Sequence, residues 1–171
     1  MAAVSLPFRT LAWEGGIDGR FVILDQRLLP GEAKEIVLDT VLAVRDAITS
    51  LAVRGAPALG AAAAYGLVVA AREGADAAGV RRCLREGRAC LASSRPTAHN
   101  LFFALERMKK APESEETTDR LKKSLVDEAI KIHGEEADAT RRLSQYGAEL
   151  IKDGWTILTH CNTGPLATSG Y

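Results

Sequence analysis

The sequence predicts a fold between the α+β and α/β classes. A mostly helical amino-terminal domain that opens with a β-hairpin is expected over residues 1–153, and the first strand–loop–helix of an α/β domain over residues 154–171. Three observations predict this fold: a hairpin pattern comes first, helical patterns dominate the middle, and a β-rich apolar run follows the last helix. Abundant alanine and an aromatic content of only 5 % favour closely packed helices over a β-sandwich.

The first expected element is a hairpin over residues 10–25. Ala12-Trp13-Glu14 and the run 20–24 are separated by a glycine-rich turn, in which Asp18-Gly19 supplies the turn chemistry. Leu29-Pro30-Gly31 then breaks the chain, and a helix is expected from about residue 40 to residue 51.

A second helix is expected in the uncharged run of residues 55–71. This run is shorter than the roughly 20 residues that a membrane span needs, and much of it is alanine and glycine, so it predicts a buried central helix. Pro57 fits the first turn of this helix, because its missing N–H is not needed there. A third helix is expected to run to about residue 91, and a fourth to begin around Arg95-Pro96-Thr97.

A long amphipathic helix is expected after a charged linker at residues 109–118. Its apolar positions are Leu121, Leu125, Ile132, Leu143 and Leu150. Residues 155–159 then predict a strand buried in a parallel sheet, followed by a turn and a helix that starts near Leu166. Because one such unit cannot bury both faces of its strand, we expect the chain to be the amino-terminal half of a longer protein and to be inactive by itself.

Charge and cysteine content exclude several kinds of partner. The 22 basic and 22 acidic residues give a net charge of zero, so we expect no nucleic-acid partner and no membrane partner. The first ten residues lack the pattern of a signal peptide. Three widely spaced cysteines argue against a disulfide framework and favour the cytoplasm, and no cysteine–histidine spacing predicts a metal site.

Three turns rich in small residues each lead into an expected helix start. Helix starts present unpaired N–H groups and a partial positive charge, which suit a phosphate. Arg54 precedes Gly55 and Ala56 in one of these turns, and Arg95 precedes Pro96 in another. A guanidinium binds phosphate through two parallel hydrogen bonds, although for each arginine taken singly an exposed side chain beside an ordinary helix cap is the commoner case.

The third turn contains Cys161, at the expected strand end and before the expected helix start. The field of a helix start lowers the pKa of a cysteine, and ligands of open α/β folds gather at the carboxyl ends of strands. The alternative is a buried, inert cysteine. Core packing is the prediction for Cys83 and Cys90, and no role is assigned to His99 or His133.

Four motifs in the same order resemble those of the methylthioribose-1-phosphate isomerase family, whose superfamily includes translation initiation factor 2B α, β and δ subunits. The resemblance covers residues 10–171. Its motifs are Leu24-Asp25-Gln26 with Leu29-Pro30-Gly31, the run 53–66 from Val53-Arg54-Gly55-Ala56-Pro57 to Tyr65-Gly66, Ser94-Arg95-Pro96-Thr97 with Asn100-Leu101, and the run 158–164 around His160-Cys161-Asn162.

The resemblance implies a helical amino-terminal domain joined to a Rossmann-like domain, a homodimer, and conversion of 5-methylthioribose 1-phosphate to 5-methylthioribulose 1-phosphate in methionine salvage without an organic cofactor. It implies that Arg54, Gly55, Ala56 and Arg95 bind the sugar-phosphate substrate and that Cys161 is the catalytic cysteine. The family's partner aspartate would lie beyond Tyr171. Pro165 departs from the small residue expected there and removes one N–H from that loop.

Two other functions share this fold by resemblance. One is ribose-1,5-bisphosphate isomerase, which keeps the same cysteine–aspartate pair. The other is a regulatory subunit of the translation-initiation guanine-nucleotide exchange factor, which acts by binding and has no need of the cysteine. The presence of Cys161 in its loop favours an enzyme.

Overall fold

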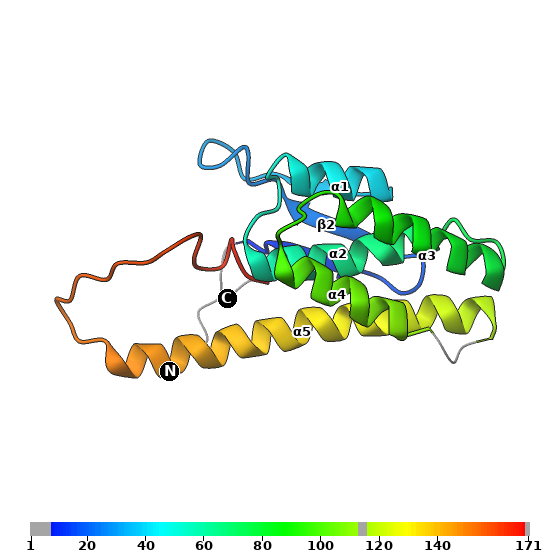
Figure 1. Cartoon of the computed structure of the whole chain (residues 1–171). Coiled ribbons are helices and arrows are strands. Elements are labelled where there is room, and N and C mark those ends of the chain that lie inside the picture. Colours follow the sequence, from blue (N-terminus) through cyan, green and yellow to red (C-terminus); the bar gives the residue numbers. More distant parts are fainter. Residues whose placement is uncertain (1–7, 113–115, 170–171) are drawn as a thin grey trace.

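The computed structural model describes residues 8–112 and 116–169, and it is rich in helix with one small antiparallel sheet (Figure 1). The expected hairpin and the five helices expected before residue 154 are confirmed, and a short third strand was not predicted. The elements in chain order are β1 (Leu11–Glu14), β2 (Arg20–Leu24), β3 (Glu35–Val37), α1 (Val41–Thr49), α2 (Ala56–Ala71), α3 (Ala77–Ala92), α4 (His99–Lys110) and α5 (Thr118–Leu150).

The sheet has the order β1-β2-β3, and both neighbouring pairs are antiparallel. Glu14 pairs with Arg20 across the β1–β2 turn, as the position of Asp18-Gly19 predicts. Phe21 and Ile23 of β2 are fully buried, and the Phe21 ring lies 5.3 Å from that of Tyr65 in α2. The sheet is therefore attached to the helices through aromatic packing on one side.

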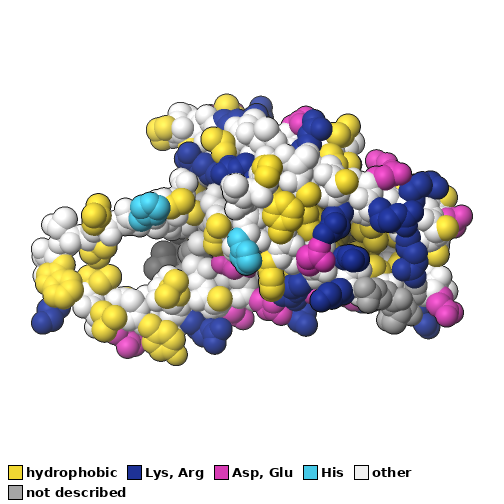
Figure 2. All heavy atoms as spheres, viewed as in Figure 1, with side chains coloured by type: hydrophobic (Ala, Val, Ile, Leu, Met, Phe, Trp, Pro, Cys, Tyr) yellow, Lys and Arg dark blue, Asp and Glu magenta, His cyan; other side chains and the backbone are white. Residues whose placement is uncertain are grey.

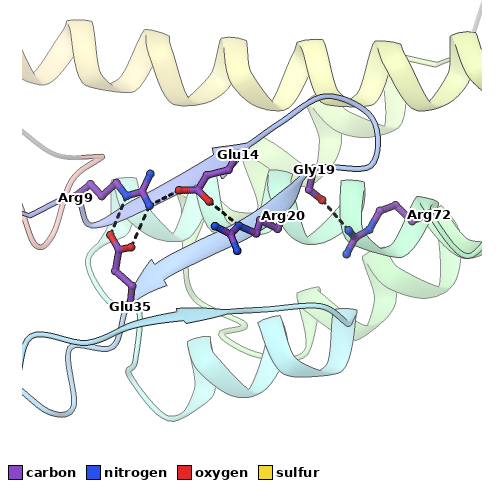
Figure 3. Close-up of polar contacts among 6 residues, drawn as sticks. All are labelled: Arg9, Glu14, Gly19, Arg20, Glu35 and Arg72. Atoms are coloured by element: carbon purple, nitrogen blue, oxygen red, sulfur yellow. Dashed lines mark hydrogen bonds and ion pairs between the residues drawn. The ribbon is translucent and has the colours of Figure 1, made fainter.

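Charged side chains join the strands to one another and to α2 (Figure 3). Arg9 contacts Glu35 at 2.8 Å and also Glu14, which in turn accepts from Arg20 at 2.6 Å. At the β1–β2 turn, next to Arg20, Arg72 donates to the Gly19 carbonyl at 2.7 Å. The three carboxylate contacts are exposed and contribute little each, so they set register more than stability.

Helix α2 is the centre of the core, as its uncharged composition predicts. Every residue from Ala58 to Ala71 is buried. Small side chains let neighbouring helices approach closely: a Cβ on Gly60 would lie 3.2 Å from the Asn100 carbonyl oxygen of α4. Alanine costs nothing in helix propensity, so this close packing and a stable helix are compatible.

Helix α5 packs on the core with its first half only. Leu121, Leu125 and Ile132 are buried, whereas Leu143 and Leu150 are exposed, so only the first half of the predicted apolar stripe packs on the core. Figure 1 shows the second half of α5 extending beyond the other helices. The described part of the chain contains nothing that covers these two leucines.

Two further predictions need correction. Cys83 and Cys90 lie half-buried on α3 rather than in the core, because α3 buries Val80, Gly87 and Leu91 instead. Residues 155–159 form no strand: they are extended and exposed, with the Leu158 side chain 97 % exposed. A strand needs a neighbour to accept its hydrogen bonds, and none pairs with this segment within residues 8–112 and 116–169.

Residues 165–169 form turns and not the expected helix start. The structure thus gives no Rossmann-like element over 154–169, and the remaining residues 170–171 of that predicted domain lie outside the described part. Residues 113–115 of the predicted charged linker are outside it too. Among the helices of the described residues, none combines the length and the apolar character that crossing a bilayer requires.

Candidate functional site

The first part of the candidate site is the start of α2. Gly55 caps this helix with φ 97° and ψ 134°, a conformation that only glycine adopts without strain, and Pro57 lies in the first turn as expected. Arg54 is half-buried and Ala56 is exposed. The Ala58 N–H already donates to the Ala167 carbonyl at 3.3 Å, so this helix start is partly occupied by the chain itself.

The second part is the turn that carries Arg95. Arg95 is half-buried, and its carbonyl accepts from the Ala98 N–H at 3.0 Å. Helix α4 begins only at His99, because Pro96 and Thr97 remain in the turn, so the expected start near Pro96 is corrected by three residues. Because the first turn of α4 packs on the second turn of α2, both arginine-bearing turns lie at the same end of the helices (Figure 1).

The third part is residues 164–169, which return to the start of α2 after the excursion of residues 151–163 (Figure 1). Main-chain carbonyls of this segment accept four hydrogen bonds, two from residues next to the sheet and two from helices. The pairs are Thr10 Oγ1 to Pro165 at 2.5 Å, Gln26 Nε2 to Leu166 at 2.8 Å, Ala58 N to Ala167 at 3.3 Å and His133 Nε2 to Ser169 at 3.2 Å. The segment is thereby held in one register.

Gly55 lets this segment come as close as it does. A Cβ at Gly55 would lie 2.4 Å from the Cα and the carbonyl oxygen of Ala167, which is closer than any side chain tolerates. The glycine expected to admit a phosphate therefore admits the chain's own backbone. Gly55 and Ala56 still border the exposed surface beside Arg54.

Cys161 lies three residues before Gly164 and is exposed, with φ 65°. The alternative of a buried cysteine is therefore wrong. The expected helix after Cys161 is absent from the described residues, so no helix start acts on its thiol. Among those residues the structure records no contact that joins Cys161 to Arg54 or Arg95; residues 164–169, which follow Cys161, contact the start of α2 next to Arg54.

A cavity of about 480 Å³ lies between α5 and this returning segment. It is lined by Thr140, Leu143 and Ser144 of α5 and by Pro57, Asn162 and Pro165 among other residues. The cavity is thus bounded by the start of α2 and by the loop that follows Cys161. Within residues 8–112 and 116–169 no group of three or more His, Cys, Asp or Glu side chains is arranged to hold a metal ion.

Sequence reasoning missed Tyr65 and His133 as contributors to this arrangement, and it noted Gln26 only as part of Asp25-Gln26 after the hairpin strand. The Gln26 Oε1 accepts from Arg54 Nε at 3.3 Å, and Tyr65 O–H lies 2.8 Å from His133 Nδ1. Because a carbonyl only accepts, His133 Nε2 carries the proton that it donates to Ser169, and Nδ1 accepts from Tyr65. Burial lowers the pKa of His133 and raises that of Tyr65.

The contacts of Gln26, Tyr65 and His133 join residues far apart in the sequence. In the sequence, Asp25-Gln26 is a candidate through its place after the hairpin strand and in the motif Leu24-Asp25-Gln26, although turn chemistry explains the aspartate equally well. In the structure Asp25 serves that local role: it pairs with Arg27 at 2.5 Å, which holds the pKa of its carboxyl below the usual range.

Comparison with known proteins identifies the class. Residues 52–168 match the Initiation factor 2 subunit family, and the chain belongs to this family. The match includes all three turns of the candidate site, so the motif-based resemblance is confirmed at the level of the family.

The relatives include enzymes. Methylthioribose-1-phosphate isomerase from Dehalococcoides mccartyi is 51 % identical over 160 residues, which cover 90 % of this chain and 47 % of that protein. The crystal structure of 5-methylthioribose 1-phosphate isomerase from Pyrococcus horikoshii OT3 matches with a TM-score of 0.85 and 40 % identity, over 96 % of this chain and 46 % of that one.

A relative of a different kind matches equally well. The crystal structure of translation initiation factor eIF-2B, subunit delta, from A. fulgidus has a TM-score of 0.84 and 41 % identity, over 95 % of this chain and 47 % of that one. The chain therefore spans about half the length of the relatives it matches.

Proposed function

We propose that the protein carrying this chain is an aldose–ketose isomerase that converts 5-methylthioribose 1-phosphate to 5-methylthioribulose 1-phosphate in methionine salvage. The observation that carries the proposal is the docking of residues 164–169 on the start of α2. This docking places residues that follow Cys161 in contact with Gly55 and Ala58, at the helix start that comes directly after Arg54. The similarity to isomerases over nine-tenths of the chain supports the same reaction.

Arg54 and Arg95 take the role of anion clamps in this proposal. Each guanidinium offers paired N–H groups that match two phosphate oxygens, and both stand before helix starts, where the partial positive charge also favours an anion. In this proposal the phosphate meets the main chain at Gly55 and Ala56 on the exposed side beside Arg54. The Ala58 N–H is not available to it, because that group donates to Ala167.

Cys161 takes the catalytic role. A phosphate on C1 prevents the sugar from opening to a free aldehyde, so acid–base assistance must open the ring with the phosphate attached. The hydrogen on C2 then moves to C1, as a proton or as a hydride, while the C2 hydroxyl becomes the ketone. In these steps C2 is oxidised and C1 is reduced within the same molecule, so no external oxidant is needed. The Cys161 thiol would assist the proton transfer or stabilise the transition state.

The proposal extends to the whole protein. A Rossmann-like domain would begin near residue 154 and supply the acid that partners Cys161, and residues 155–159 would become a strand once neighbouring strands are present. The exposed apolar side chains of this segment support that arrangement. We further propose a homodimer that works in the cytoplasm without an organic cofactor.

A second candidate function is a non-catalytic subunit of the translation-initiation exchange factor type. The equally good match to the eIF-2B delta structure favours it. A third is isomerisation of ribose 1,5-bisphosphate, in which a second phosphate replaces the methylthio group. The three candidates differ in what the protein turns over, so one assay separates them.

The test is turnover by the complete gene product and by two matched cysteine variants. With 5-methylthioribose 1-phosphate, Cys161→Ser is expected to lose about 100-fold or more in kcat, the usual contribution of a general acid or base. Cys90→Ser, at a half-buried position of α3 outside the candidate site, is expected to keep the wild-type rate. Faster turnover of ribose 1,5-bisphosphate would favour the third candidate, and no turnover of either sugar would favour the non-catalytic subunit.

A further inference from the structure

Gln26 occupies the junction between the arginine turn and the returning segment. Its side chain is buried, with only 4 % of the residue exposed, although glutamine is usually a surface residue. Its backbone N–H donates to the Ala52 carbonyl at 3.1 Å, two residues before Arg54. The buried amide must find partners in the protein, because an unsatisfied polar group at this depth is costly.

The two ends of the Gln26 amide meet complementary groups. Nε2 donates to the Leu166 carbonyl at 2.8 Å, and Oε1 accepts from Arg54 Nε at 3.3 Å. The Leu166 carbonyl only accepts and Arg54 Nε only donates, so the amide has one orientation that satisfies both. A glutamate would lack the donor and a leucine would lack both groups, so glutamine alone among these residues makes both bonds.

A neutral amide partner also leaves the positive charge of Arg54 available to an anionic ligand. A carboxylate partner would form an ion pair with the guanidinium and compete with any anionic ligand. A neutral amide bonds to Nε and orients the group, while the two Nη atoms make no hydrogen bond or ion pair within the described part of the chain. Those Nη atoms carry the remaining donors that a phosphate would use.

We propose that Gln26 is a positioning residue of the sugar-phosphate site. It orients the Arg54 guanidinium toward the ligand and holds it in register with the segment that follows Cys161, through the single amide that bonds to both. This inference rests on the proposed function and assigns a role to a residue that touches neither the substrate nor the reacting atoms.

Thr10 supplies a matched control. Its hydroxyl bonds to the Pro165 carbonyl at 2.5 Å, one residue before Leu166, and it has no contact with Arg54 in the described structure. Thr10→Val therefore removes one anchor of the same segment and leaves the guanidinium untouched. Gln26→Leu removes an anchor and the orienting bond together.

The experiment compares Gln26→Leu, Gln26→Glu and Thr10→Val in the complete gene product. We expect Gln26→Leu to raise KM for 5-methylthioribose 1-phosphate about tenfold, the effect of losing one charge-assisted hydrogen bond. Thr10→Val should keep the wild-type KM. Gln26→Glu should bind the substrate more weakly as the pH rises through the titration of the new carboxyl, a dependence that a merely structural role would not produce.

A second readout is thermal stabilisation of each variant by inorganic phosphate, which requires no turnover. Stabilisation should survive in Thr10→Val and be lost in Gln26→Leu. If the wild type turns over no sugar phosphate but shows this pattern, the proposed function fails and the role of Gln26 stands. Wild-type KM and wild-type phosphate stabilisation in Gln26→Leu, or equal losses in Gln26→Leu and Thr10→Val, would overturn the inference.

Discussion

At the scale of single residues, Gly55 decides how the returning segment meets α2. Its backbone conformation and the 2.4 Å approach of Ala167 to the place of a Cβ both require glycine. The reason for this glycine is thus a contact with a residue 112 positions away, which no local pattern contains. The sequence alone indicates only that a ligand could approach the backbone at Gly55.

The Gly55→Ala variant is expected to lose about 2 kcal/mol of unfolding free energy, because a side chain in this region of φ and ψ is strained and the Ala167 backbone must move away. Urea unfolding measures the loss. Gly134→Ala is the control: this glycine lies exposed in α5 with nothing near its Cβ position, so the change should stabilise the helix by a few tenths to about 1 kcal/mol. Equal stability of Gly55→Ala and wild type would contradict the structure at this point.

At the scale of elements, those with strong local signals are predictable and those that depend on distant partners are not. The hairpin, α2 and the first half of α5 follow from turn chemistry, an uncharged alanine run and helical spacing. Strand β3 has only three residues and exists because β2 offers it hydrogen bonds. Residues 155–159 show the reverse: their composition favours a strand, but a strand requires a neighbour.

The residues of the candidate site also differ in whether the sequence alone indicates them. Arg54, Arg95 and Cys161 are recognisable from small-residue turns and from motif order. The anchoring roles of Gln26 and His133 are not, because their partners Leu166 and Ser169 are separated from them by 140 and 36 positions; Gln26 is recognisable only as part of a motif. Side-chain bonds to main-chain carbonyls leave no residue type to recognise at the accepting end, so this anchoring is invisible in the sequence.

His133 connects α5 to α2 and to the returning segment, and it predicts a pH dependence. Burial holds its pKa below the ordinary 6.5, so the unfolded chain binds a proton more readily than the folded one. The stability that neutral His133 contributes is therefore fully present above about pH 6.5 and is lost as the pH falls below that value. Protonation of Nδ1 would also remove the acceptor for the Tyr65 hydroxyl.

The measurement is the free energy of unfolding at several pH values between about 7 and 5. It should fall over this range in the wild type and in the exposed control His99→Gln, but stay nearly constant in His133→Gln. The carboxyls of Asp25 and Glu35 do not interfere, because their pKa values lie below 3.8 and 4.5 and their stabilisation is lost only at lower pH. A decline of the same size in His133→Gln would mean that another group is responsible.

At the scale of the whole molecule, the apolar surface is divided unevenly. The core is closed around α2, whereas the far end carries a series of exposed apolar side chains: Leu143, Tyr146, Leu150, Ile151, Trp155, Ile157 and Leu158. Figure 2 shows hydrophobic side chains spread along the projecting end of the molecule. Exposed apolar groups in this number mark a surface suited to contact with other protein, and one of them, Leu143, lines the same cavity as the loop that follows Cys161.

The two halves of α5 should consequently respond differently to the same substitution in the 171-residue chain. Leu125→Ala, in the buried half, is expected to cost about 3 kcal/mol, because it opens a cavity in a packed core. Leu143→Ala, 72 % exposed in the projecting half, should change the unfolding free energy by less than about 0.5 kcal/mol. Urea unfolding of both variants provides the comparison. If Leu143→Ala were as costly as Leu125→Ala, the projecting half of α5 would have to be packed in solution, either against another copy of the chain or against residues 151–163, and the open cavity beside the Cys161 loop would not exist in that state.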